Sequence, residues 1–338
     1  MERSKITKTL LDEFIAIFDV WEEAQPYLSL IVDEVEMRLV VGVAHQHLDV
    51  QQVADLLIMP NAEPTDLLEQ AYSRCIVDKV IEDGVTKYKI SDFYARLDHF
   101  VKYENWHDIP AEGRKIIDRR YLDEFIARNK QNIERKVQGF EAGNALPNDT
   151  IMLLREIEEM IEAASEIVVQ PCDCRKLGEN CNRPVETCIW LDEGARKALD
   201  RGHGRRLTKE EATKLLRRAD KKGLMHTADS EWRERGLHAI CNCCACDCYP
   251  FRAAQELGTK GVWPKSHYIA RYDRERCNQC GACVKRCHFE AFYHDGAIIE
   301  IDGKNKKEVA FDSEKCWGCG LCANSCPQDA IEMMSLQK

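Results

Sequence analysis

The first hundred residues carry apolar side chains at helical spacing, interrupted by one alternating stretch. Residues 10–23 place apolar residues three and four positions apart, which predicts a helix with Thr9 as its N-cap. Apolar and polar residues then alternate on both sides of Glu82-Asp83-Gly84, which is typical of a β-hairpin. Between these elements, three further helices are expected at 34–44, at 50–59 and from Pro64 or Thr65 onward.

The middle of the chain continues with predicted helices and one short strand. A long charged helix is expected over 110–141, and a second helix is expected to begin at Asp149 or Thr150. Residues 167–169 predict a strand. Thr208 and Glu211 form the pattern of a capping box, which predicts a helix over 208–222. A hairpin is expected near the C-terminus, with its turn at Asp302-Gly303-Lys304-Asn305.

The charge balance restricts the classes of partner. The 48 basic and 58 acidic residues give a net charge of −10, which argues against a nucleic-acid or anionic-membrane binder. No apolar run reaches the length of a membrane span, and residues 1–21 lack the features of a signal peptide. We therefore expect a soluble cytoplasmic protein without a membrane span.

Cysteine usage divides the chain, because 17 of the 18 cysteines lie beyond position 170. Eight of them form two copies of one pattern, Cys277-x2-Cys280-x2-Cys283-x3-Cys287 and Cys316-x2-Cys319-x2-Cys322-x3-Cys326-Pro327. Three thiolates at i, i+3 and i+6 on a tight loop can reach three irons of one cubane, whereas the fourth is carried away to the other cluster. This predicts one cluster held by Cys277, Cys280, Cys283 and Cys326, and a second held by Cys316, Cys319, Cys322 and Cys287. The alternative, two zinc sites, usually shows paired Cys-x2-Cys knuckles set well apart.

This doubled motif resembles that of bacterial-type dicluster ferredoxins, over about residues 270–335. The resemblance implies two [4Fe–4S] clusters in a ferredoxin-like module. One departure is His288, which stands where the first motif would normally have proline. The residue is interpreted as an ordinary surface histidine in preference to one that alters the second cluster.

Nine further cysteines lie upstream of the doubled motif, at 172, 174, 181, 188, 241, 243, 244, 246 and 248. Nine thiols so close in sequence predict one or two additional clusters. Cys172, Cys174, Cys181 and Cys188 form one possible set of four, and four of the five cysteines in 241–248 form another. Ligation that mixes the two segments is equally compatible with the spacing. Zinc bound by four thiolates is the main alternative, and a redox-active disulfide is a further one.

Residues 165 to the end resemble multi-cluster 4Fe–4S proteins of anaerobic bacteria, which often carry a winged-helix-like N-terminal region. The matching segments are 171–175, 186–188, 240–244 and 277–326. This resemblance implies redox work, extra cofactors and an anaerobic host. The helix and hairpin order of residues 30–98 agrees with the winged-helix pattern, but that stretch holds thirteen acidic and six basic residues. A protein-docking role is therefore favoured over DNA binding.

Together these features predict an α+β fold in four parts: a helical, winged-helix-like region at 1–104, a helical connector at 105–165, a cysteine-rich region at 166–265, and a 2[4Fe–4S] ferredoxin domain at 266–338. The predicted function is an iron–sulfur protein that relays low-potential electrons to or from a partner oxidoreductase. Two alternatives remain open: a redox enzyme with a substrate-accessible cluster in the central region, and a redox-sensing regulator.

Overall fold

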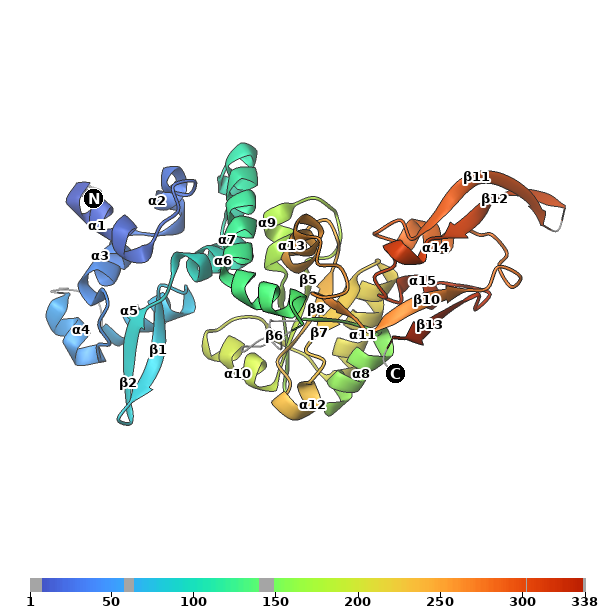
Figure 1. The fold of residues 1–338 in the computed structure, drawn as a ribbon. Coiled ribbons are helices and arrows are strands. Elements are labelled where there is room, and N and C mark those ends of the chain that lie inside the picture. The colour runs from blue at the N-terminus through green and yellow to red at the C-terminus, as the bar shows by residue number, and fades with distance from the viewer. Residues whose placement is uncertain (1–7, 58–63, 140–148, 302, 337–338) are drawn as a thin grey trace. The chain divides into compact units, whose positions relative to one another are not determined.

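The computed structural model describes residues 8–57, 64–139, 149–301 and 303–336 (Figure 1). The chain forms two compact units, of which the first comprises residues 1–121 with 201–203 and the second comprises 122–200 with 204–338. Helices and strands are both abundant, which confirms the α+β class. The four-part division by sequence stays a prediction.

The first unit contains helices followed by a two-stranded hairpin. The helices before the hairpin are α1 (Lys8–Phe18), α2 (Leu28–Ile31), α3 (Glu34–Val43), α4 (Val50–Leu56) and α5 (Pro64–Ser73). The antiparallel strands β1 (Val77–Glu82) and β2 (Val85–Ile90) follow. Asp33 and Asp49 form capping boxes at α3 and α4 with the side chains three residues later. This order agrees with the sequence prediction, whereas the winged-helix identification stays a prediction.

Two helix boundaries of this unit differ from the expectation. Thr9 lies inside α1, so it is not the N-cap, and α1 ends at Phe18 because Asp19 has a positive φ of 53°. The helix expected at 50–59 is α4, which ends at Leu56, and residues 58 and 59 lie outside the described part of the chain. Residues 1–7, part of the segment 1–21 that lacks the features of a signal peptide, also lie outside the described part of the chain.

A buried ion pair links helix α6 (Phe93–Tyr103) to the residue that follows it. Arg96 is 0% exposed and donates from Nη1 and Nη2 to the two carboxylate oxygens of Glu104, at 2.8 and 2.9 Å. Burial acts to raise the pKa of Glu104, but hydrogen bonds from His99 and Arg96 outweigh it and lower the pKa to about 2. The ionised carboxylate therefore stabilises this unit above pH 4.5, and the contribution is lost as the pH falls towards 2.

A seven-stranded sheet forms the centre of the second unit. Its strand order is β6-β4-β5-β8-β7-β3-β9, and all neighbours are antiparallel except β3 and β9. The strands are β3 (Thr150–Met152), β4 (Ile167–Pro171), β5 (Glu186–Leu191), β6 (Arg205–Arg206), β7 (Met225–Ala228), β8 (Ala239–Cys243) and β9 (Lys265–Ser266). The prediction of a helix start at Asp149 or Thr150 is wrong, because Thr150, Ile151 and Met152 pair with β7 in the buried sheet.

Alternation along the strands directs side chains to two differently covered faces. Ile167 and Val169 of β4 pack with residues of α8 (Leu154–Ala163) and α11 (Lys209–Lys221) on one face. Val168 points the other way and packs against α10 (Asp192–Asp200). The expected capping box of α11 is present, with Glu211 N–H donating to Thr208 Oγ1 at 3.2 Å. The second face also carries α13 (Tyr249–Leu257), which packs on Ile151, Met225 and Cys243.

The long charged helix is present as α7 (Ala111–Val137), and its expected last two residues, 140 and 141, lie outside the described residues. Within the second unit, Phe125 of this helix contacts the rings of Tyr249 and Trp263, at centroid distances of 5.9 and 5.8 Å. Apolar contact therefore fixes this part of α7 against α13, and the helix is held by packing although most of its sequence is polar.

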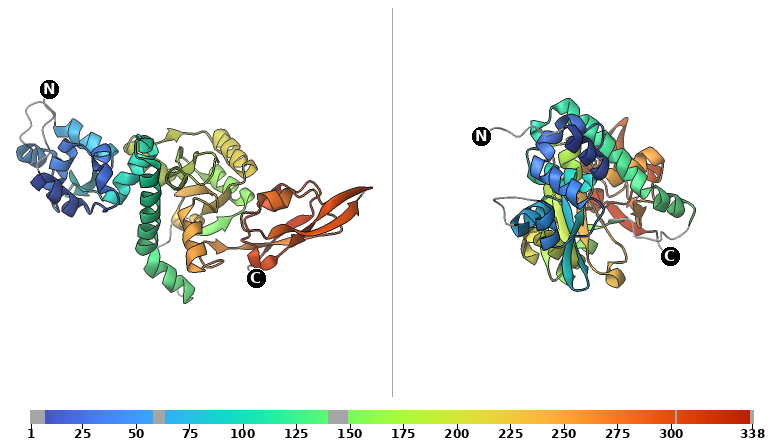
Figure 2. Two further views of the ribbon diagram at one scale, coloured as in Figure 1. Left: turned by 90° about the horizontal axis from the view of Figure 1, so that it is seen from above. Right: turned by 90° about the vertical axis from the view of Figure 1, so that its left-hand side faces the viewer.

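The ferredoxin-like part of the second unit is built from two short helices and two strand pairs. Its helices are α14 (Ala282–Arg286) and α15 (Leu321–Asn324). Strand β10 (Tyr268–Tyr272) pairs with β13 (Ile331–Ser335), and β11 (Phe292–Ile301) pairs with β12 (Lys304–Phe311). The β11–β12 hairpin extends away from the rest of the unit (Figure 1 and the left view of Figure 2). Asp302 of its expected turn lies outside the described residues.

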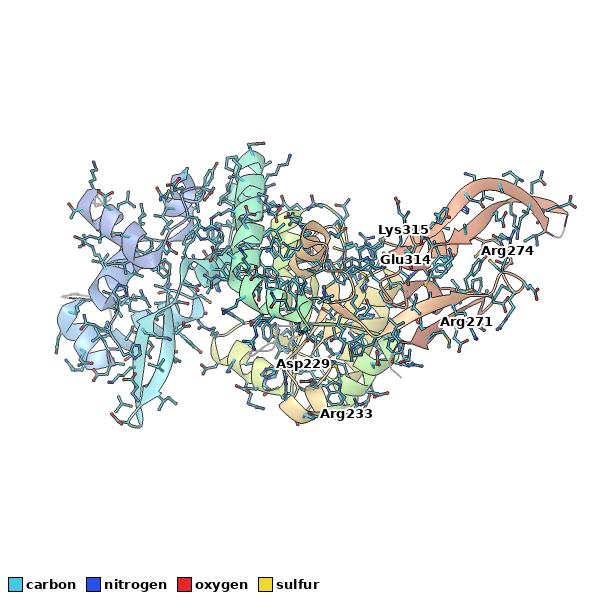
Figure 3. The ribbon with its side chains drawn as sticks, viewed as in Figure 1. Asp229, Arg233, Arg271, Arg274, Glu314 and Lys315 are labelled. Atoms are coloured by element: carbon cyan, nitrogen blue, oxygen red, sulfur yellow. The ribbon has the colours of Figure 1, made fainter. Side chains whose placement is uncertain are left out.

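Two arginines form ion pairs within this module. Arg271 of β10 pairs with Glu332 of β13, and Arg274 pairs with Glu308 of β12. Figure 3 shows both arginines along the β10 end of the module. A buried carboxylate joins the module to the central sheet, because Asp220 of α11 accepts from Asn324 Nδ2 at 2.7 Å and from Arg286 Nη2 at 3.2 Å. These two hydrogen bonds hold α14 and α15 of the ferredoxin-like part against α11.

We expect Glu104→Gln to destabilise α6 by about 3 kcal/mol, because the variant leaves Arg96 buried without a counter-charge. Hydrogen exchange of the α6 amides at pH 7 measures this loss as reduced protection. The matched control is Glu34→Gln, which removes an exposed ion pair with Arg38 and should change local stability by less than about 1 kcal/mol. Equal protection in the two variants would contradict the prediction.

Candidate metal centres

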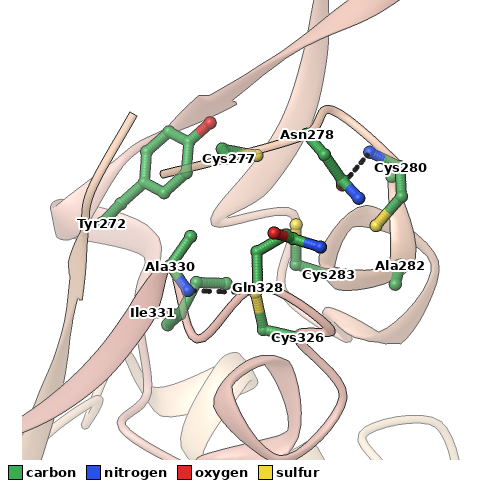
Figure 4. A pocket seen from close by; sticks show the side chains of 11 residues that line it. Tyr272, Cys277, Asn278, Cys280, Ala282, Cys283, Cys326, Gln328, Ala330 and Ile331 are labelled. Atoms are coloured by element: carbon green, nitrogen blue, oxygen red, sulfur yellow. Dashed lines mark hydrogen bonds between the residues drawn. The ribbon is translucent and has the colours of Figure 1, made fainter. Parts of the chain in front are cut away.

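Four cysteines from both ferredoxin motifs line one small pocket (Figure 4). Cys277, Cys280 and Cys283 come from the first motif, and Cys326 arrives from the second. Gly281 (φ 69°) turns the chain into α14 and so places Cys283 at the first turn of that helix. Burial, followed by the neighbouring Cys277 and Cys280, raises the pKa of Cys283 to about 12. Convergent sulfurs around a lined cavity are a donor set that fits an iron–sulfur cluster.

The second motif forms an equivalent group with the remaining cysteine of the first. Burial and then the charges of Cys287 and Cys316 raise the pKa of Cys319 to about 12. The same two sulfurs, together with Cys319, also raise the pKa of the buried Cys322. The sulfurs of Cys287, Cys316, Cys319 and Cys322 therefore lie close enough to act on one another, which is the grouping expected from the spacing.

Backbone N–H groups donate to equivalent sulfurs in the two halves of the module. Two of these bonds reach the first cysteine of each motif, from Gln279 N to Cys277 Sγ at 3.3 Å and from Gly318 N to Cys316 Sγ at 3.4 Å. The fourth cysteine of each motif accepts from the residue four positions later, Ala291 or Ala330, at 3.2 Å. The two halves therefore share the same pattern of hydrogen bonds to sulfur. Such bonds to the ligand sulfurs are one determinant of the reduction potential of a cluster.

His288 is not the ordinary surface histidine that the sequence suggested. Its ring is partly buried, and Nε2 donates to the carbonyl of Gly223 at 2.6 Å. Burial lowers the pKa of His288, which favours the neutral ring. The residue after the ligand Cys287 thus ties the first motif to the end of α11.

Six of the nine upstream cysteines form a closed ring of sulfur contacts in the second unit. The order around the ring is Cys172, Cys174, Cys248, Cys243, Cys241 and Cys188, and each sulfur is hydrogen-bonded with the next. The sulfurs of Cys243 and Cys248 are 3.2 Å apart. Hydrogen bonds from two neighbours hold the pKa of Cys172 and that of Cys243 well below the usual range.

Strand pairing explains how residues far apart in sequence reach this ring. Cys188 of β5 and Cys241 of β8 lie on neighbouring antiparallel strands, one residue beyond the partners Ile189 and Ile240. Because side chains alternate, Cys188, Cys241 and Cys243 share the face opposite α8 and α11. Cys172 and Cys248 sit at the N-caps of α9 (Asp173–Gly178) and α13. Six thiolates exceed the four that a single tetrahedral ion or a [4Fe–4S] cubane uses, so the ring fits a centre of two or more metal ions.

The other three cysteines form a second group with a carboxylate. Cys181, Cys244, Cys246 and Asp247 each offer one donor atom, and these atoms all lie within 4.8 Å of one another. A hydrogen bond from Cys246 and, more weakly, the charge of Arg175 lower the pKa of Cys244 to about 7 against the effect of burial. Neither of the two local sets of four is assembled, since both groups mix the segments around 172–188 and 241–248.

Arg175 lies between the two groups and was not singled out from the sequence. Its guanidinium is 3% exposed and donates to Pro184 O at 2.6 Å and to Asn242 O at 2.7 Å. Burial acts to lower the pKa of Arg175, but the nearby Cys172 and Cys244 raise it. A permanently charged side chain in this position stabilises thiolates of both groups. Its place directly after Cys-x-Cys was the signal that could have identified it.

Asp247 is the second residue missed by sequence reasoning. It is 0% exposed, and Oδ1 accepts from the backbone N–H of Asn180 at 2.8 Å. An acid placed between two cysteines in a run of five cysteines was the available signal, because a buried carboxylate is rare without a partner.

A histidine pair in the first unit is better explained by hydrogen bonding. His203 Nε2 lies 2.6 Å from the carbonyl of Ser73 and 3.0 Å from His99 Nδ1, close to Cys75. The guanidinium of Arg201 is 3.5 Å from Cys75 Sγ, so a metal cation would meet a fixed positive charge. We therefore assign no metal to this group.

One packed cluster connects the ferredoxin module to the six-cysteine ring. Cys243 and Cys248 of the ring share it with Trp317, and Cys319 packs against the same cluster. The rings of Phe289 and Trp317 stack within it at a centroid distance of 4.3 Å. The cysteines of the second ferredoxin group and of the ring are therefore separated by close-packed side chains.

No helix in the described part of the chain is both long and apolar enough to cross a membrane. A family model of the 4Fe–4S dicluster domain matches residues 270–333. No curated protein and no solved structure shows significant similarity to the chain. The C-terminal part is thus similar to dicluster ferredoxin domains, and with the cysteine groups this suggests iron–sulfur electron transfer.

Proposed function

We propose that this protein relays low-potential electrons between a partner oxidoreductase and its central metal centre, through two [4Fe–4S] clusters. One cluster would be held by Cys277, Cys280, Cys283 and Cys326, and the other by Cys316, Cys319, Cys322 and Cys287. When bound, such clusters supply one-electron redox chemistry. The chain's own residues hold them, bury them and donate hydrogen bonds to their ligand sulfurs.

The observation that carries the proposal is the shared packing of Cys319 with Cys243 and Cys248. Electron transfer through protein weakens steeply with the gap between centres, so a relay requires neighbouring ligand sets in close-packed surroundings. The aromatic side chains of Phe251, Phe289 and Trp317 fill this gap and exclude water. With this placement, electrons would pass between the first cluster and the ring by way of the second cluster.

Exposure supports the direction of contact with the partner. Cys280 is exposed, whereas Cys319 is enclosed by the cluster around Trp317. A redox partner approaches the first cluster most closely at Cys280, and the ring lies at the other end of the relay. We extend the proposal to the first unit, in which α3, α4, α5 and the β1–β2 hairpin would form a winged-helix-like docking region. Its excess of acidic residues favours a protein partner over DNA.

We expect anaerobically purified protein to contain more than about eight irons per chain, because two cubanes take about eight and the six-cysteine ring adds metal. Iron and sulfide assays with EPR of the reduced protein measure this. A content of about eight would leave the ring without iron and would restrict the relay to the ferredoxin module. A content near zero, with no EPR signal of a reduced cluster, would contradict electron transfer altogether.

Ligand exchange between the two motifs gives a sharper test. Cys283→Ala and Cys326→Ala should lose the same EPR signal and about four irons each, because both residues would hold the first cluster. Cys287→Ala and Cys319→Ala should each lose the other EPR signal, because both residues would hold the second cluster. The matched control is Cys75→Ser in the first unit, which should change neither. If Cys287→Ala instead resembled Cys283→Ala, the crossed assignment of the fourth cysteine would be wrong.

A further inference from the structure

The group of Cys181, Cys244, Cys246 and Asp247 brings three thiols and one carboxylate within 4.8 Å of one another, whereas Cys172 and Cys188 of the ring, with Asp173, bring only three donors together. We propose that these four side chains form a mononuclear tetrahedral site for a thiophilic divalent cation of the zinc type, separate from the iron–sulfur centres. The site would be structural and redox-silent. It goes beyond the electron relay, because it assigns these three cysteines a different cofactor and adds Asp247 as a ligand.

The distances between the donor atoms match the edges of one tetrahedron. A Zn–S bond of about 2.3 Å places two thiolates on the same ion about 3.8 Å apart. The sulfurs of Cys181 and Cys244 are 3.8 Å apart. Asp247 Oδ2 lies 3.0, 3.3 and 3.4 Å from the sulfurs of Cys181, Cys244 and Cys246. A carboxylate oxygen and a thiolate on one zinc ion are expected about 3.5 Å apart, so these four distances fit one ion. The other two, from Cys246 Sγ to the sulfurs of Cys181 and Cys244, are below 4.8 Å.

The ferredoxin module provides an internal comparison. A cubane takes each thiolate on a different iron at a different corner, so its ligand sulfurs lie farther apart than the ligands of a single ion. Among the residues that the structure describes, no three of the eight ferredoxin cysteines bring their sulfurs within 4.8 Å of one another. The close group around Asp247 therefore has the spacing of one ion and not of a cubane.

Burial and charge indicate that a cation belongs in this group. Asp247 and Cys244 are both 0% exposed. Among the described residues, the hydrogen-bond partners of Oδ2 of the carboxylate are thiols, and S–H groups are weak donors. A buried anion with such partners is unfavourable, whereas a divalent ion satisfies the carboxylate and the three sulfurs together.

The surrounding chain is shaped to hold the carboxylate in this orientation. Asn180 N–H fixes Oδ1, which leaves Oδ2 directed at the sulfurs. Gly178 supplies the space, because a Cβ at this position would lie 2.6 Å from Oδ1. A ligand ordered by its neighbours in this way is typical of a built metal site. The ion would connect the loop after α9 to the segment between β8 and α13.

The full-length protein, purified anaerobically, tests the site by elemental analysis and zinc-edge X-ray absorption. We expect about one zinc per chain beyond the iron, in a shell of three sulfurs at about 2.3 Å and one oxygen. Cys181→Ser and Asp247→Asn should retain zinc at least about tenfold less well against a chelator, with iron and sulfide unchanged. Gly178→Ala should weaken retention without removing a ligand. Cys75→Ser is the matched control and should retain zinc as the wild type does.

Two outcomes would overturn the proposal. Loss of about four irons in Cys181→Ser, with no zinc in the wild type, would assign the group to a further cubane. Zinc that shows four sulfurs and no oxygen, or that is retained equally in all variants, would place the ion elsewhere. The zinc-edge spectrum of the wild type distinguishes a shell of three sulfurs and one oxygen from one of four sulfurs, even if a variant fails to fold. Because iron and EPR are measured on the same samples, failure of the zinc site is distinguishable from failure of the electron relay.

Discussion

Concentrated thiolate charge is the constraint on which the second unit depends. Cys241, Cys243 and Cys248 pack on the face of the sheet that α13 covers, whereas Cys181, Cys244 and Cys246 pack against Ala219 of α11 and Leu224. Thiolates at such distances would repel one another inside a protein, so a positive charge beside them is stabilising. Arg175 supplies one fixed positive charge between the two groups, held by three hydrogen-bond acceptors from the backbone and Thr187.

This constraint also explains why the ferredoxin module packs so closely against the sheet. Its second cysteine group contributes Cys319 to the cluster that encloses Cys243 and Cys248. On the other face of the sheet, His226 Nδ1 lies 2.7 Å from Asn242 Oδ1, and Asp220 accepts from Asn324 Nδ2 of the module at 2.7 Å. Buried polar groups of this kind are stable only when each finds a partner. The module and the sheet therefore share both an apolar core and a hydrogen-bond network.

Local patterns predicted the local features well. Thr208 with Glu211 predicted the start of α11, because a capping box lies within one turn. The doubled cysteine motif places three cysteines within seven residues of each loop, so a ligand assignment followed from the spacing alone, and it stays a prediction. The helix predicted from Thr150 was wrong because apolar residues at 151 and 154 fit a strand followed by a helix equally well. The grouping of the upstream cysteines could not be predicted, since it depends on the pairing of β5 with β8. Asp247 was missed for the same reason: its partner Cys181 is 66 residues away.

The pairing of β5 with β8 has a consequence for how the protein is made. The ferredoxin ligands lie on two loops that fold locally, so most of each ligand set exists as soon as its loop is synthesised. Both central groups instead draw on residues near 172–188 and near 241–248, and their ligand sets come together only when the intervening chain has been placed in the sheet. Contacts of such long separation form slowly, and metal binding contributes to the folding free energy of the site it completes. The proposed metal sites of the central region would therefore form only together with the sheet.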